Sequence, residues 1–83
     1  MNGEPDAPGP DVDARGLRCP LPVIRLARLA TRLPPGHRVL VWATDPAAAA
    51  DIPAWCRMRG HTVTVTDEGE HAAYAVVLGS APD

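Results

Sequence analysis

The chain has 83 residues, 46% of them hydrophobic, with a formal net charge of −2. This length suits one globular domain with a thin core and is too short to enclose a large cofactor. Two cysteines are too few for a disulfide framework, and no apolar run approaches the ~20 residues of a membrane helix. We therefore expect a cytoplasmic protein with reduced thiols, no cofactor and no membrane partner.

The acidic residues are concentrated at the N-terminus. Four of the ten acids fall within the first 13 residues, and all eight cations, each an arginine, come later. Residues 1–10 also contain three prolines and two glycines without apolar periodicity, so we predict a flexible tail. Residues 11–80 are predicted to form a single domain. The small net positive charge of this domain suits docking onto acidic protein surfaces and is too weak to indicate a nucleic-acid-binding protein.

The first elements after the tail are a short strand and a helix. Residues 11–15 fit an edge strand, and residues 20–33 show the clearest helical pattern. At about 100° per residue, one face collects the apolar side chains Val23, Leu26, Ala27, Leu29, Ala30 and Leu33. Arg25, Arg28 and Arg32 lie on the opposite face, and Pro34-Pro35-Gly36 ends the helix.

The middle of the chain predicts a buried strand and a second helix. Residues 39–43 are a continuous apolar run, and Asp45 before Pro46 resembles a helix start, with Asp45 as the N-cap. Pro53 then favours a short turn over residues 46–50 and a separate helix over residues 52–59, with Asp51 as a second N-cap. This helix should bury Ile52, Trp55 and Cys56 and end at Gly60.

The end of the chain predicts a β-hairpin. Residues 62–66 alternate threonine with valine, and residues 72–78 form a last strand after an acidic turn. The element order is then βαβαββ. Because the threonines leave one face of the sheet wet, both helices must cover the other face. We predict an α/β fold, a two-layer sandwich with two helices on one face of a mixed four-stranded sheet.

The segment most suggestive of chemistry is Arg18-Cys19-Pro20-Leu21-Pro22, where the first strand meets the first helix. Pro20 suits the first position of a helix and holds the preceding residue extended, so we expect Cys19 to be the N-cap. A helix N-terminus and nearby arginines, Arg18 and Arg15, favour the thiolate, which is the nucleophilic form. The N–H of Leu21 could then hold the outer sulfur of a persulfide.

The absence of a second thiol beside Cys19 favours storage of sulfur. Thioredoxin-like centres contain Cys-x-x-Cys, but Pro22 replaces the second cysteine here. A neighbouring thiol would attack a persulfide and expel sulfide, whereas Cys-Pro-Leu-Pro has no such neighbour. A lone cysteine is more often a buried hydrophobic residue, which is how we interpret Cys56. The two flanking prolines set Cys19 apart from that case.

These motifs together resemble the TusA/SirA-type sulfur-carrier family. The resemblance rests on Cys19-Pro20-Leu21-Pro22, the Asp13–Cys19 segment before it, and a second block from Asp45 to Cys56. It covers roughly residues 11–79. It implies a two-layer sandwich with Cys19 as the persulfide-bearing residue, loaded by a cysteine desulfurase or rhodanese and unloaded by an acceptor protein. The fold it implies is also similar to the C-terminal domain of translation initiation factor three.

Other readings of the sequence remain open. A zinc site would need both cysteines and some of His37, His61 and His71, but their spacing matches no ligand pattern. An RNA-binding module is suggested by the arginine face and the initiation-factor-like fold, although few aromatic residues are present for base stacking. A regulatory interaction module would use Cys19 only structurally. As a carrier, the protein would meet its partners through Arg25 and Arg28.

Overall fold

The computed structural model describes residues 9–79. In chain order its elements are β1 (Val12–Ala14), α1 (Leu21–Ala30), β2 (Arg38–Ala43), α2 (Ala48–Arg59), β3 (Thr62–Asp67) and β4 (Ala72–Val77). The strands form one sheet in the order β1-β2-β4-β3. β1 is parallel to β2, and β4 is antiparallel to both β2 and β3, so the sheet is mixed.

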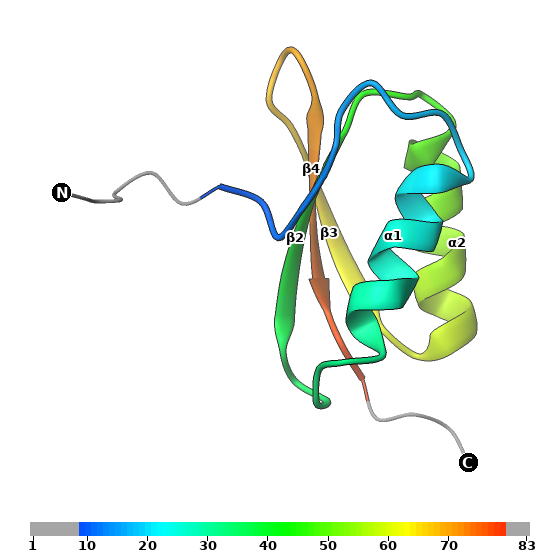
Figure 1. The fold of residues 1–83 in the computed structure, drawn as a ribbon, viewed down its shortest axis with the longest axis vertical. Helices are drawn as coiled ribbons and strands as arrows, with labels where there is room; N and C mark the ends of the chain where they lie inside the picture. Colours follow the sequence, from blue (N-terminus) through cyan, green and yellow to red (C-terminus); the bar gives the residue numbers. More distant parts are fainter. Residues whose placement is uncertain (1–8, 80–83) are drawn as a thin grey trace, which may run out of the picture.

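Both helices lie on one face of this sheet, and the other face is uncovered (Figure 1). The predicted two-layer sandwich, its element order and its mixed sheet are confirmed. Alternation along the strands explains the layering, because successive side chains of a strand point to opposite faces. Val39, Val41 and Ala43 of β2 are buried beneath the helices, whereas Thr62 and Thr64 of β3 are exposed.

Helix α1 is shorter than predicted and begins one residue later. It starts at Leu21 with Pro20 as the N-cap, and its regular part ends at Ala30. The prediction that Cys19 is the N-cap is therefore wrong. The N–H of Leu21 donates to the carbonyl of Arg18 at 2.9 Å, so a turn containing Cys19 precedes the helix.

Helix α2 is one continuous helix with Pro53 inside it. The predicted separate turn over residues 46–50 is wrong, and so is the assignment of Asp51 as an N-cap. Pro53 removes only the hydrogen bond that the carbonyl of Ala49 would accept. Ala49 is exposed, and the helix continues through this turn. Ile52 and Cys56 are buried and Trp55 is half-buried, as predicted, and Gly60 ends the helix with φ of 79°.

The predicted flexible tail falls mostly on residues 1–8, which lie outside the described residues, as does residue 80. The domain boundaries at residues 11 and 80 remain predictions. Within residues 9–79, no helix is long and apolar enough to cross a membrane.

Candidate functional site

Two loops meet at one end of the sandwich and position Cys19. They are the β1–α1 loop and the β2–α2 loop, which lie together at the top of Figure 1. The Cys19 N–H donates to Oδ2 of Asp45 at 2.8 Å, and Oδ1 of Asp45 accepts the N–H of Ala47 at 3.0 Å. One carboxylate thus ties the cysteine backbone to the start of α2. Asp45 is not the N-cap that we predicted, because Ala47 holds that position.

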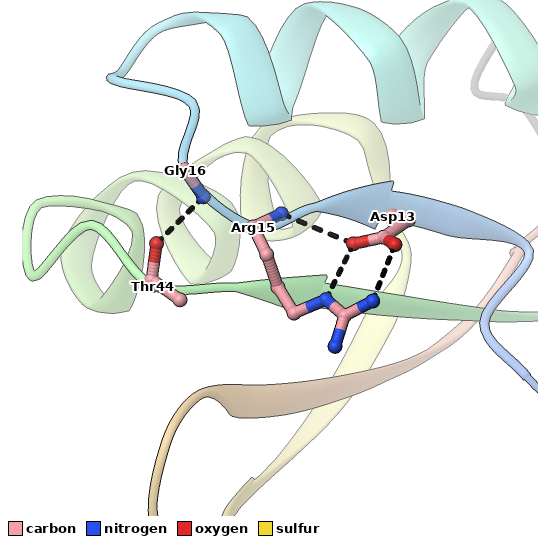
Figure 2. Close-up of polar contacts among 4 residues, drawn as sticks. All are labelled: Asp13, Arg15, Gly16 and Thr44. Carbon is pink, nitrogen blue, oxygen red and sulfur yellow. Dashed lines mark hydrogen bonds and ion pairs between the residues drawn. The ribbon is translucent and has the colours of Figure 1, made fainter.

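A second hydrogen bond joins the same loops. The Gly16 N–H donates to Oγ1 of Thr44 at 2.8 Å, as Figure 2 shows. Gly16 has φ of 79°, a conformation that glycine adopts without strain, and it turns the chain from β1 toward α1. Thr44 and Asp45 are adjacent, so this one segment fixes both ends of the loop that carries Cys19.

Arg15 does not support Cys19, contrary to our expectation. Its side chain turns away from α1 and its guanidinium meets the Asp13 carboxylate at 2.7 Å (Figure 2). The guanidinium also lies over the Trp42 ring, 4.9 Å from the centroid. These hydrogen bonds lower the pKa of Asp13 to about 2. Arg15 therefore belongs to the uncovered face of the sheet.

The electrostatic environment of Cys19 is the reverse of the predicted one. Desolvation, a hydrogen bond with the Asp51 carboxylate and the charges of Asp51 and Asp45 raise the pKa of this half-buried thiol to about 11. Asp45 is ionised at neutral pH, because the N–H groups of Ala47 and Cys19 hold its pKa below the usual range. Arg18 contributes to that shift in the pKa of Asp45 and so balances part of its charge. Cys19 consequently rests as a neutral thiol.

The first turn of α1 offers few donors to a sulfur anion. The Leu21 N–H, which we expected to be free, is bonded to Arg18, and Pro22 has none. Val23 is then the first helix residue whose N–H meets no backbone acceptor within residues 9–79. Pro22 itself is fully buried, so it anchors the helix start in the core.

Cys56 is a core residue, as predicted. It is 1% exposed, whereas Cys19 only packs against the edge of the core. Burial alone raises the pKa of Cys56 to about 11. Both thiols are therefore neutral, but only Cys19 has access to solvent.

Three site neighbours were missed or misread in the sequence. Asp45 and Asp51 were interpreted as helix caps. An aspartate that precedes a proline by one or two residues can also accept hydrogen bonds from donors elsewhere in the fold. Tyr74 was not singled out. It is fully buried in β4, and desolvation, with a smaller effect of the Cys19 thiolate, raises its pKa. No local pattern in residues 72–78 indicates this effect.

Two arginines of α1, and a third in the turn after it, line a groove that begins on the helix at Leu21, two residues after Cys19. We call it the β1–α1 groove; it measures about 530 Å³ and is lined by Asp11, Val12, Asp13, Leu21, Ile24, Arg25, Arg28, Leu29 and Arg32. Arg25 and Arg28 are exposed and do not contact Cys19. They extend the site along the helix.

The rings of His61 and His71 pack against tryptophan side chains. The His71 ring stacks on Trp42 with 4.4 Å between the centroids. His61 stacks on Trp55, and its Nδ1 accepts the Gly79 N–H at 3.0 Å. Among residues 9–79, no three His, Cys, Asp or Glu side chains gather as metal ligands would.

The two carboxylates should make Cys19 slow to alkylate. We expect Asp51→Asn to lower the pKa of Cys19 only in part, because desolvation remains. Each unit by which the pKa falls raises the thiolate fraction about tenfold and lowers thiolate nucleophilicity about threefold. The net gain is about threefold per unit, measured as the iodoacetamide rate at pH 8. Asp67→Asn on β3 is the control, and equal rates for both variants would contradict this environment.

The comparisons with known proteins agree with the fold and identify the family. The crystal structure of a SirA-like protein from Desulfitobacterium hafniense has a similar fold, with a TM-score of 0.74 and 21% sequence identity. The match covers 83% of this chain and 96% of that one. The family model described as sulfurtransferase TusA matches residues 11–79. Because that match spans β1 through β4, the chain belongs to the TusA sulfurtransferase family.

Proposed function

We propose that this protein carries sulfane sulfur as a persulfide on Cys19 and relays it from a donor protein to an acceptor protein. Membership of the TusA sulfurtransferase family supports a sulfur-carrier role. The assignment to Cys19 rests on the difference in solvent exposure between the two thiols. Cys19 is partly exposed and is held by Asp45 at the junction of two loops, whereas Cys56 is enclosed in the core.

The reaction is a thiol–persulfide exchange. The Cys19 thiolate attacks the outer sulfur of a donor persulfide, as a cysteine desulfurase or rhodanese would present it. A bond forms between the Cys19 sulfur and that outer sulfur, while the donor's S–S bond breaks and its cysteine leaves as thiolate. Discharge repeats the step with an acceptor thiolate as the nucleophile. No external oxidant or reductant is consumed.

The raised pKa of Cys19 suits a carrier that must keep its cargo. Cys19 is the leaving group during discharge, and thiols of higher pKa leave more slowly. A pKa of about 11 therefore protects the persulfide against thiols encountered at random. The same pKa keeps the thiolate fraction small, so loading is also slow until a donor is docked.

Docking of a partner provides the way to reverse this protection. A cationic group of the partner placed beside Asp45 and Asp51 would neutralise the charges that raise the pKa of Cys19. The thiolate then becomes both more abundant and a better leaving group. Sulfur exchange is thereby favoured within the docked complex over exchange in free solution.

The exposed arginines of α1 provide the docking surface. Arg25 and Arg28 lie on the helix that begins beside Cys19, and neither forms an ion pair with a carboxylate within residues 9–79. An acidic partner surface that reaches Cys19 would meet these two side chains. The attraction between exposed charges is screened by salt, which gives the interaction a measurable signature.

Reversing both charges should slow sulfur transfer from the donor. We expect Arg25→Glu with Arg28→Glu to lower the second-order rate constant at low salt about tenfold or more and to remove its salt dependence. Arg57→Glu with Arg59→Glu in the last turn of α2 is the matched control and should transfer normally. Unchanged transfer by the α1 variant in low salt would show that these arginines form a solvated helix face with no role in docking.

The relay itself is tested in two stages. The protein is first incubated with a cysteine desulfurase and cysteine and is then separated from both by gel filtration. Cyanolysis of one portion measures the bound sulfane sulfur, and a second portion is presented to an acceptor protein bearing a free thiol. We expect sulfane sulfur on the carrier after gel filtration and none on it after incubation with the acceptor. A protein that elutes without sulfane sulfur would overturn the proposed function.

A further inference from the structure

The β1–α1 groove has the features of a binding site for an extended acidic segment. One wall is the outer edge of β1, which is the first strand in the sheet order. The Asp11 N–H donates to the Leu40 carbonyl on the β2 side. The register pairs Val12 with Val41, and Leu40 of β2 faces β1, so the Val12 backbone is directed to β2. Because successive backbone groups of a strand point to opposite edges, the Asp13 N–H and carbonyl face the groove. Within residues 9–79, no strand pairs with them.

The other wall combines charge with apolar surface. Arg25, Arg28 and Arg32 follow one another at spacings of three and four residues, so their guanidinium groups share one side of α1. Between them and β1 lie Leu21 and Ile24, which are 43% and 40% exposed. Exposed large apolar side chains inside a charged rim mark a surface that contacts a partner.

The acidic residues of the groove do not neutralise this charge. Asp13 is paired with Arg15, which points away from α1 (Figure 2). Oδ2 of Asp11 accepts the Leu40 N–H at 2.8 Å, so this carboxylate is turned toward β2. The groove therefore presents three guanidinium groups opposed by a single unpaired carboxylate. An occupant with several negative charges complements it.

We infer that the β1–α1 groove binds an extended acidic segment of a partner protein, which adds to the sheet as a strand beside β1. Backbone hydrogen bonds to Asp13 would fix its direction, and acidic side chains on one side would meet the arginines of α1. Apolar residues at alternate positions would contact Leu21 and Ile24. A second copy of this chain is a poor occupant, because two cationic grooves would face each other.

This inference rests on the proposed function and adds how a partner binds, namely through an extended acidic segment. The groove starts at Leu21, two residues from Cys19, and runs along α1. A segment seated in it would hold the rest of the partner near the reactive sulfur. RNA phosphates could also meet the arginines, but the apolar floor and the free strand edge favour a peptide.

The test uses a short blocked peptide that alternates glutamate with valine. We expect saturable binding to the full chain and slower hydrogen exchange at the Asp13 amide. Arg32→Glu should weaken binding at least tenfold, whereas Arg57→Glu on α2 should leave it unchanged. A peptide with proline at the pairing positions should bind more weakly, because it lacks the donors that a strand needs.

Three results would overturn the inference. They are equal binding of a peptide with lysine in place of glutamate, binding without protection of the Asp13 amide, and displacement of the peptide by single-stranded RNA at lower concentration. Loading with inorganic polysulfide, which needs no docking, separates this inference from the proposed function. If Cys19 loads and the peptide does not bind, the groove assignment fails alone. If Cys19 does not load, the carrier function fails whatever the peptide does.

Discussion

Pro22→Cys is expected to turn the carrier into a protein that loses its sulfur as sulfide. The introduced thiol lies three residues after Cys19, where a thioredoxin-like motif has its second cysteine. It would attack the inner sulfur of the Cys19 persulfide, form a disulfide with Cys19 and expel the outer sulfur as sulfide. Transfer to an acceptor should fall nearly to zero while free sulfide rises in proportion, and added dithiothreitol should restore loading.

Pro22→Ser is the matched control for this variant. Serine is close to cysteine in size and its introduction also removes the proline ring, but it has no thiol. This variant should therefore keep its persulfide as long as the parent does. Both variants lose a buried proline, and we expect each to lower the free energy of unfolding by about 1–2 kcal/mol. Pro22 has no N–H and lies in the first turn, so no helical hydrogen bond is affected. A Pro22→Cys protein that retains its persulfide would show that the missing second thiol gives no protection.

The two cysteines should respond to substitution in opposite ways. Cys19→Ser is expected to abolish persulfide formation completely, because a hydroxyl cannot replace the attacking thiolate, and to leave the melting temperature nearly unchanged. Cys56→Ser should load normally and lose about 1–3 kcal/mol of stability, because it places a hydroxyl in an apolar core. Loading and thermal unfolding of the two variants check this. Equal loading would refute the assignment of Cys19.

Much of the fold could be predicted because its elements follow simple periodicities. The alternation of threonine and valine in β3 and the apolar run of β2 identify the two faces of the sheet. Helix boundaries were less accurate. Pro53 costs α2 one hydrogen bond, and the sequence does not reveal that the helix tolerates this loss at an exposed turn.

The sequence singles out Cys19 as the candidate reactive residue, but its electrostatic environment could not be predicted. Cys19 stands out through its flanking prolines, which are neighbours in sequence. Its acidic neighbours, Asp45 and Asp51, come from α2 and the loop before it and reach the thiol only through the packing of two loops. Arg15, close in sequence, is drawn to Asp13 on the other face of the sheet. The sign of the pKa shift was therefore predicted wrongly from local residues.

The most direct test follows one isotopically labelled sulfur atom through the protein. The carrier is loaded by a cysteine desulfurase with cysteine labelled in its sulfur, alkylated and digested, and the label is located by peptide mass spectrometry. We predict that the label is found on the Cys19 peptide alone, as one added sulfur, and that it moves to the acceptor thiol when the carrier is presented before alkylation. Label on the Cys56 peptide, or label that stays on Cys19 in the presence of acceptor, would contradict the account.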